Sequence, residues 1–366
     1  MKKNKVLKYP IFLLIGLGSL LFIFSQCHTS TENLNAQKKS TFFQENNTAD
    51  TKQKGVHIFG RTDSIDFEPL SQTNIDWITL VSYGYQEQHD TPEVRHTRRD
   101  TSFARRRDAR LIKRIEAAKA AGFKVFVKPH IWMRATPEGK WRSDIYPVND
   151  ENWELWKKSY REFIIRYAKI AEKSNAEMFC IGTELTRLSL EKPDFWRSLI
   201  QEVRKIYSGK ITYAANWYKE YEKIEFWDDL DYIGIQAYFP LVKKKNPTVE
   251  QLSNGWNKYL SSIDSIHKKY NRKILFTELG YKSTSDSAIK PWEWINRPPK
   301  PDKELSMETQ ANCYQAFFDT VWEKDWFAGV HLWEFRINFD NERAKGDFNF
   351  TPQGKPAEQI IAKGFE

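Results

Sequence analysis

Cysteine is scarce in this chain, which has three cysteines in 366 residues. Cys27 follows an N-terminal apolar run, Cys180 lies in a strand-like run, and Cys313 lies in a helix-like segment more than one hundred residues later. In the architecture predicted below, Cys180 and Cys313 fall on different sides of the fold, so we expect no disulfide between them. Neither has the spacing of a metal ligand, and no cluster of histidine and acidic residues requires a metal. We therefore expect no metal and no cofactor.

The sequence also lacks a glycine-rich phosphate-binding loop, since neither Gly-x-Gly-x-x-Gly nor a Walker-type motif follows any strand-like run. This absence argues against nucleotide binding. The formal net charge of +9 falls to 9 − 4 = +5 if an N-terminal segment with four lysines is removed. So modest a charge argues against a dedicated nucleic-acid-binding protein. One arginine cluster remains, which we interpret either as a solvated loop and helix start or as a contact for an anionic group: Arg95, Arg98, Arg99, Arg105, Arg106 and Arg107.

The N-terminal apolar run, residues 11–24, has 14 residues and is too short for a comfortable membrane span. Four lysines precede it, which is typical of an export signal. Cys27 then resembles the lipidation point of a bacterial lipoprotein, although Gln26 departs from the small residue usual before that cysteine. We predict an exported, membrane-anchored lipoprotein, periplasmic or on the cell surface. A plain cleaved signal and a retained membrane anchor are the alternatives.

The chain divides into three predicted parts. Residues 1–26 form the signal peptide. Residues 27–54 form a polar tether that begins at the lipidated cysteine and is rich in serine, threonine, asparagine, glutamine and lysine. Residues 55–366 form one folded domain, without internal repeats or a second domain.

Short apolar runs alternate with longer amphipathic segments throughout the folded domain. Strand-like runs occupy 56–59, 77–83, 125–130, 178–183, 211–216, 232–238, 274–278 and 330–333. Helix-like segments occupy 109–121, 152–172, 194–207, 249–270 and 307–323, with Asp150 and Ser306 as expected N-caps. Segments 67–72 and 221–227 are each expected to form one turn or a loop. Eight strands alternating with helices predict a single (β/α)8 TIM barrel.

Two of the strand-like runs end on a glutamate, Glu184 and Glu278. In a TIM barrel the C-terminal ends of the strands meet at one rim, where active sites are built. Paired carboxylates at such a rim favour glycosidic bond hydrolysis, in which one acid protonates the departing oxygen and the other attacks or shields the sugar carbon. The chain also has 14 tryptophans, of which we assign about half to packing and the rest to contact with sugar faces. Other residues at the strand ends are Tyr83, His130, Trp132, Asn216, Trp217, Tyr238 and Trp333.

At this point the chain resembles the retaining glycosidases of clan A and, more narrowly, glycoside hydrolase family 113, which is known for β-1,4-mannanases. The likeness covers roughly residues 55–335. It lies in the order and spacing of Lys128-Pro-His130, Ile181-Gly-Thr-Glu184-Leu, Gln236-Ala-Tyr238, Thr277-Glu278-Leu-Gly-Tyr281 and Leu332-Trp333-Glu334. One departure from the clan is Thr183, where most members place an asparagine that binds the sugar 2-hydroxyl. The contact with the sugar 2-hydroxyl must then come from another residue, and Asn216 is the candidate.

The resemblance implies roles for individual residues. Glu184 would be the acid/base, Glu278 the nucleophile, and Tyr238 a hydrogen-bond donor that keeps Glu278 ionised. The two carboxyls would lie about 5–5.5 Å apart, which implies retention of the anomeric configuration. His130, Trp132, Asn216 and Trp333 would line the sugar subsites, and the substrate would be a β-linked mannose polymer or oligomer.

Several alternatives stay open from the sequence. Either glutamate could be a salt-bridged structural acid, and Glu334 is a competing acid, although strand alternation turns it away from the side that Trp333 faces. His130 could instead be a packed core residue. Lys128 is expected in the barrel wall, paired with an acid, and the alternative is a contact with the substrate. Trp292 and Trp294 either contact substrate or hold their own loop. For function, the alternatives are hydrolysis of another β-glycan such as xylan or glucomannan, and a non-catalytic carbohydrate-binding lipoprotein.

Overall fold

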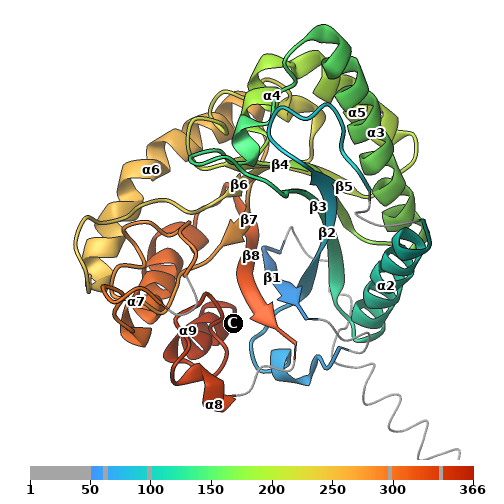
Figure 1. Ribbon diagram of the computed structural model, residues 1–366. Helices are drawn as coiled ribbons and strands as arrows, with labels where there is room; N and C mark the ends of the chain where they lie inside the picture. The colour runs from blue at the N-terminus through green and yellow to red at the C-terminus, as the bar shows by residue number, and fades with distance from the viewer. Residues whose placement is uncertain (1–50, 61–64, 97–100, 296–298, 338–340) are drawn as a thin grey trace, which may run out of the picture. The chain divides into compact units, whose positions relative to one another are not determined.

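The computed structural model describes residues 51–60, 65–96, 101–295, 299–337 and 341–366, and their core is a closed barrel of eight parallel strands (Figure 1). Neighbours in the sequence are neighbours in the barrel, and β1 closes it against β8 with Gly55 opposite His331. The predicted TIM barrel is therefore confirmed. The strands are β1 (Gln53–Phe59), β2 (Trp77–Gln86), β3 (Lys124–Met133), β4 (Met178–Thr183), β5 (Lys210–Asn216), β6 (Tyr232–Gln236), β7 (Ile274–Leu279) and β8 (Phe327–Arg336).

Helices surround the barrel on its outer side (Figure 1). Among the described residues, none of them is both long enough and apolar enough to cross a membrane. The helices are α2 (Thr101–Ala120), α3 (Asp150–Lys173), α4 (Thr186–Glu191), α5 (Pro193–Arg204), α6 (Val249–Tyr270), α7 (Met307–Phe317), α8 (Asn341–Ala344) and α9 (Pro356–Gly364). Short turns of helix are η1 (Glu68–Leu70), η2 (Arg142–Asp144), η3 (Trp227–Asp229) and the π-helical η4 (Phe318–Trp322).

The helix boundaries differ from the prediction in several places, among them α2, α7 and the cap of α3. Helix α2 begins eight residues before the predicted position 109, and the predicted segment 307–323 divides into α7 and η4. The N-cap of α3 is Asn149, whose side chain accepts a hydrogen bond from the backbone N–H of Asn152 at 2.8 Å, so the predicted cap Asp150 is wrong. Asp150 instead lies in the first turn of α3, where its negative charge interacts favourably with the positive end of the helix dipole. The predicted cap Ser306 is confirmed by its bond from Thr309 N.

The interior of the barrel changes from apolar to polar along the strands. An apolar cluster fills the end where the strands begin, and it contains Trp77, Phe126, Met178, Cys180, Ala214, Leu275 and Ala328. Two residues after Phe126, Lys128 faces the same interior, because side chains on one face of a strand recur at every second position. Buried polar residues above the cluster include His57, Lys128, Gln236 and His331. The floor of the rim is therefore a layer of buried polar groups.

The two cysteines of the described residues are both free and buried. Cys180 belongs to the apolar cluster inside the barrel, whereas Cys313 lies on α7 outside it.

Candidate active site

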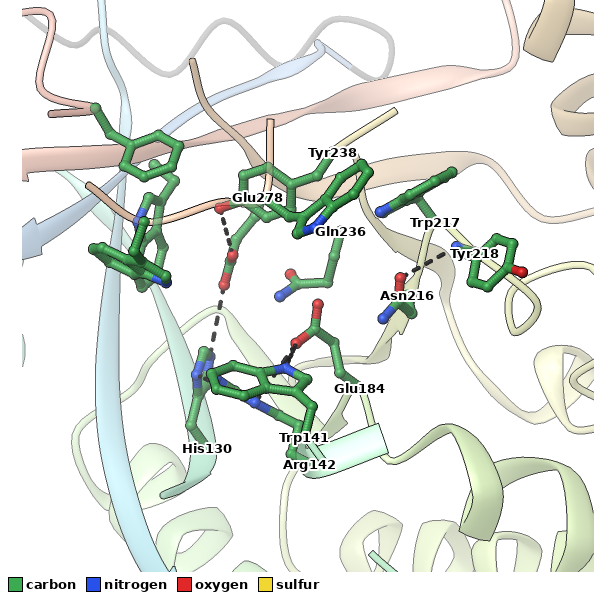
Figure 2. A pocket seen from close by; sticks show the side chains of 14 residues that line it. His130, Trp141, Arg142, Glu184, Asn216, Trp217, Tyr218, Gln236, Tyr238 and Glu278 are labelled. Carbon is green, nitrogen blue, oxygen red and sulfur yellow. Dashed lines mark hydrogen bonds and ion pairs between the residues drawn. The ribbon is translucent and has the colours of Figure 1, made fainter. Parts of the chain in front are cut away.

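A cavity of about 560 Å³ lies at the ends of the strands, and both predicted acids line it. Figure 2 shows the carboxyl groups of Glu184 and Glu278 directed into the same space. Glu278 is the fifth residue of β7, and Glu184 directly follows β4. The full lining is His130, Trp141, Arg142, Glu184, Asn216, Trp217, Tyr218, Gln236, Tyr238, Glu278, Trp292, Trp294, Trp333 and Phe350.

Glu278 is held by two donors on its two oxygens. The Nζ of Lys128 lies 2.5 Å from Oε1, and the hydroxyl of Tyr238 donates to Oε2 at 2.8 Å. The predicted Tyr238 hydrogen bond is thus confirmed. Lys128 is fully buried and also donates to Gln236 Oε1 at 2.8 Å. A charge-assisted bond of this kind is among the stronger hydrogen bonds of proteins, and it holds the Glu278 carboxyl in place.

His130 faces the carboxyl of Glu278 from the side opposite Tyr238 (Figure 2). Arg142 lies with a guanidinium nitrogen 3.0 Å from His130 Nδ1, which must then accept the hydrogen bond. Burial lowers the pKa of His130 well below its ordinary value, so the ring is neutral and carries its proton on Nε2. That atom lies 3.8 Å from Glu278 Oε1, too far for a direct hydrogen bond. His130 is therefore a cavity residue and not only a packed core histidine.

Glu184 has a different environment. Trp141 donates its indole N–H to Oε2 at 3.3 Å, and Arg142 Nε lies 3.6 Å from the same oxygen. Burial raises the pKa of Glu184, the guanidinium of Arg142 opposes that rise, and the negative charge of Glu278 adds to it. The net direction is upward, so the Glu184 carboxyl retains its proton to higher pH than an ordinary glutamic acid.

The other predicted site residues divide into two groups. His130, Asn216, Tyr238, Trp292 and Trp333 all line the cavity, together with Trp294. Trp132 does not line it. Strand β3 continues past His130, so Trp132 lies beyond the cavity edge, where its indole is 47% exposed and meets Tyr83 edge-on at 6.0 Å. Cys27 lies outside the described residues.

Aromatic side chains form two walls of the cavity. On one side Trp217 stacks with Trp292, with ring centroids 5.2 Å apart, and on the other Trp294 meets Trp333 edge-on at 6.0 Å. Trp292 and Trp294 both come from the long loop after β7, and both are about half exposed. Exposed indoles beside a carboxylate pair are suited to contacts with sugar faces.

Glu334 does not belong to the cavity, as strand alternation predicted. Its side chain is buried and accepts two hydrogen bonds from Arg336, at 2.9 and 2.5 Å. In the arginine cluster, Arg95 pairs with Glu93 and Arg107 donates to the backbone oxygens of Tyr83 and His96. Within the described part of the chain, no group of three histidine, cysteine or acidic residues is arranged to hold a metal.

Sequence reasoning missed the site contacts of four polar or aromatic residues. Trp141 and Arg142 come from the loop between β3 and α3, and a Trp-Arg pair in a long loop at the C-terminal end of a strand was the available signal. Lys128 was expected beside an acid, but its partner proves to be Glu278 itself. Gln236 was identified in a motif, without a role in holding Lys128.

A closed (β/α)8 barrel with two glutamates in one aromatic-walled cavity defines the general class of barrel glycosidases. The model of Glycoside Hydrolase Family 113 matches residues 58–355, so the chain belongs to this family and is a glycoside hydrolase. A comparison with curated proteins gave no match.

Solved structures of the same family are similar over nearly their whole length. A GH113 β-1,4-mannanase structure is 29% identical with a TM-score of 0.72, covering 86% of this chain and 98% of the other. The GH113 β-mannanase from Alicyclobacillus acidocaldarius, in complex with ManMIm, is 27% identical with the same TM-score, covering 86% and 97%. A β-glucuronidase from Ruminococcus gnavus is 12% identical with a TM-score of 0.54 over 86% of this chain and 50% of its own, and shares the fold only.

The Lys128–Glu278 pair leads to a stability prediction. Lys128→Met should destabilise the fold by about 3 kcal/mol, because it leaves a buried carboxylate without its cation. The double variant Lys128→Met/Glu278→Gln should recover most of that loss, since it removes both charges. Urea unfolding of the two variants and the wild type measures this. A double variant no more stable than Lys128→Met would show that the ion pair is not what couples these residues.

Proposed function

We propose that this protein is a retaining glycoside hydrolase that cleaves β-1,4-mannosidic bonds of mannan or manno-oligosaccharides by double displacement. Similarity to structures described as β-1,4-mannanase and β-mannanase supports the substrate. One observation carries the mechanism: two carboxyls line one cavity in opposite environments. Glu278 is bound to a buried ammonium, whereas burial raises the pKa of Glu184.

In the first step, Glu278 attacks the anomeric carbon while Glu184 donates its proton to the departing glycosidic oxygen. The C–O bond to the leaving group breaks, and an ester bond forms between the sugar and Glu278. Lys128 and Tyr238 hold the attacking carboxylate in place before this step. Carboxyl groups about 5–5.5 Å apart are the spacing that this mechanism requires.

In the second step, Glu184 takes a proton from a water molecule as the water oxygen attacks the anomeric carbon. The ester bond to Glu278 breaks, which frees the Glu278 carboxylate and leaves Glu184 protonated for the next cycle. Esterification removes the charge of Glu278, which had raised the pKa of Glu184. The positive charges of Lys128 and Arg142 remain, and both lower that pKa. The same carboxyl is therefore an acid in the free enzyme and a base in the intermediate, and inversion in each step gives overall retention.

The second candidate in the same class is hydrolysis of another β-glycan, and the aromatic walls suit any β-linked sugar chain. Parallel product analysis on mannan, glucomannan, xylan and mannotriose separates these possibilities. Mannan and mannotriose should be cleaved, with products of retained configuration by NMR, and xylan should not. Turnover of xylan alone would overturn the proposed substrate, and inverted products would overturn the mechanism.

Replacement of each acid should give a different response to azide. Glu278→Ala and Glu184→Ala should both remove mannan hydrolysis, the second by about 10³-fold because general acid catalysis contributes on that scale. With an activated aryl β-manno-oligosaccharide, azide should restore turnover in both. Glu278→Ala should yield the α-glycosyl azide, because azide occupies the space of the nucleophile. Glu184→Ala should yield the β-glycosyl azide, because azide attacks the ester intermediate. Reversed anomers would exchange the two roles, and a non-catalytic binder would show no hydrolysis in any variant.

Arg142 should set the alkaline limit of activity. Its guanidinium lowers the pKa of Glu184, so Arg142→Met should raise that pKa further and move the alkaline limb of the kcat/KM profile to higher pH. Arg134→Met is the matched control, because Arg134 pairs with Glu87 outside the cavity and should leave the limb in place. An alkaline limb that stays or moves to lower pH in Arg142→Met would contradict this assignment.

We further propose that the protein is exported and anchored through a lipid on Cys27, which is supported by the basic and apolar segment before it. In a bacterial host, labelled palmitate should be incorporated into the wild type, which should enter the detergent phase on Triton X-114 partition. Cys27→Ser should lose the label and move to the aqueous phase. An unlabelled wild type in the aqueous phase would indicate a plain cleaved signal. A Cys27→Ser protein that stays with detergent would indicate a retained anchor.

A further inference from the structure

Glu220 is a fully buried acid behind the cavity wall, four residues after the end of β5. Its carboxylate accepts four hydrogen bonds. Thr186 Oγ1 and Asn216 N donate to Oε2 at 2.9 and 2.6 Å, and Ser189 Oγ and Tyr213 OH donate to Oε1 at 2.6 and 2.7 Å. Glu220 does not line the cavity itself.

These donors surround the segment that carries Glu184. Thr186 and Ser189 belong to α4, which begins two residues after Glu184. The Tyr213 hydroxyl, which donates to Glu220, also accepts a hydrogen bond from the backbone N–H of Leu185 at 2.8 Å. The stretch 185–189 is therefore tied to Glu220 at three points, two direct and one through Tyr213.

The backbone at Glu184 needs such support. Its φ is +53°, in the left-handed region, which is unfavourable for a residue with a side chain and persists only where the surroundings fix it. Its own N–H donates to Ala214 O on β5 at 2.9 Å. The Glu220 contacts fix the residues that follow, and so they determine the direction in which the Glu184 side chain leaves the backbone.

Burial of Glu220 is not balanced by a cation. No basic side chain in the described ranges forms an ion pair with it, and burial raises its pKa to about 7. Replacing a fully hydrogen-bonded buried acid removes several bonds at once and leaves its donors without an acceptor. In the part of the chain that the structure describes, its side-chain bonds join the Glu184 segment to β5, at whose end Asn216 faces the cavity.

We propose that Glu220 is a positioning residue for the general acid, which clamps segment 185–189 and the end of β5 so that Glu184 is presented to the departing oxygen. This inference rests on the proposed role of Glu184 as acid/base. Glu220 touches neither the substrate space nor the reacting atoms. Its effect should therefore reach the chemistry only through Glu184, and on kcat/KM, which reports the first step, only through proton donation to the leaving group.

Leaving-group dependence tests this role. The dinitrophenolate group of a 2,4-dinitrophenyl β-manno-oligosaccharide departs without protonation. The sugar leaving group of an unactivated manno-oligosaccharide departs only when its oxygen is protonated. In Glu220→Gln, kcat/KM on the unactivated substrate should fall by about 30-fold, a part of the 10²–10⁴ that general acid catalysis supplies. On the dinitrophenyl substrate kcat/KM should stay within about threefold, because expulsion of that leaving group does not use the acid. Ser189→Ala removes one of the donors to Glu220. It should also lower kcat/KM on the unactivated substrate alone, by a smaller factor than Glu220→Gln does.

Glu177→Gln is the matched control. Glu177 also accepts a bond from a backbone N–H, that of Val125 at 2.7 Å, but it lies at the opposite end of the barrel, where β3 and β4 begin. Its replacement should leave the ratio of the two kcat/KM values unchanged, whatever it does to the melting temperature. Equal losses on both substrates in Glu220→Gln and Ser189→Ala, or no loss, would overturn the clamp.

Glu184→Ala separates this inference from the proposed function. A large selective loss in Glu184→Ala without one in Glu220→Gln and Ser189→Ala would reject only the clamp. A Glu184→Ala variant with no selectivity would reject Glu184 as the general acid, and the clamp with it. If Glu220→Gln does not fold, Ser189→Ala and Thr186→Val each remove a single donor and decide the question.

Discussion

The ion pair between Lys128 and Glu278 is the constraint on which the site depends. Lys128 stands fully buried above the apolar cluster of the barrel, where a cation persists only beside an anion. It holds the carboxyl of Glu278, which is the nucleophile in the proposed mechanism. The same positive charge lowers the pKa of Glu184, which favours the role as base that we propose for Glu184 in the ester intermediate. In the proposed double displacement, one buried ammonium would therefore assist both steps.

The sequence was sufficient for the fold and for the positions of both acids. Runs that are apolar at nearly every position and alternate with amphipathic segments are typical of strands buried on both faces, and a carboxylate at the end of such a run is then expected at the rim. That reasoning located Glu184 and Glu278, and the family resemblance located the Tyr238 bond; the barrel, the family and that bond are confirmed. Alternation along β8 also correctly turned Glu334 away from the cavity.

Other features depend on loop conformation and on partners distant in sequence, which periodicity does not encode. Trp141 and Arg142 reach Glu184 because the loop after β3 folds back over the rim. Trp132 is on a strand and was expected in the cavity, but the strand extends past the rim. Glu220 follows β5 among polar residues, and only the packed structure brings α4 onto it. The sequence signals for a helix N-cap were also wrong by one residue at α3, where the cap is Asn149 and not Asp150.

The central claim, that Glu278 forms a covalent bond to the sugar, is tested most directly by trapping the intermediate. A 2-deoxy-2-fluoro mannosyl donor with a dinitrophenolate leaving group should inactivate the wild type, because the fluorine slows the second step more than the activated first step. Mass spectrometry of the digested protein should find one added fluorosugar on the peptide that contains Glu278. A label on any other residue, or turnover without a trapped species, would contradict the account.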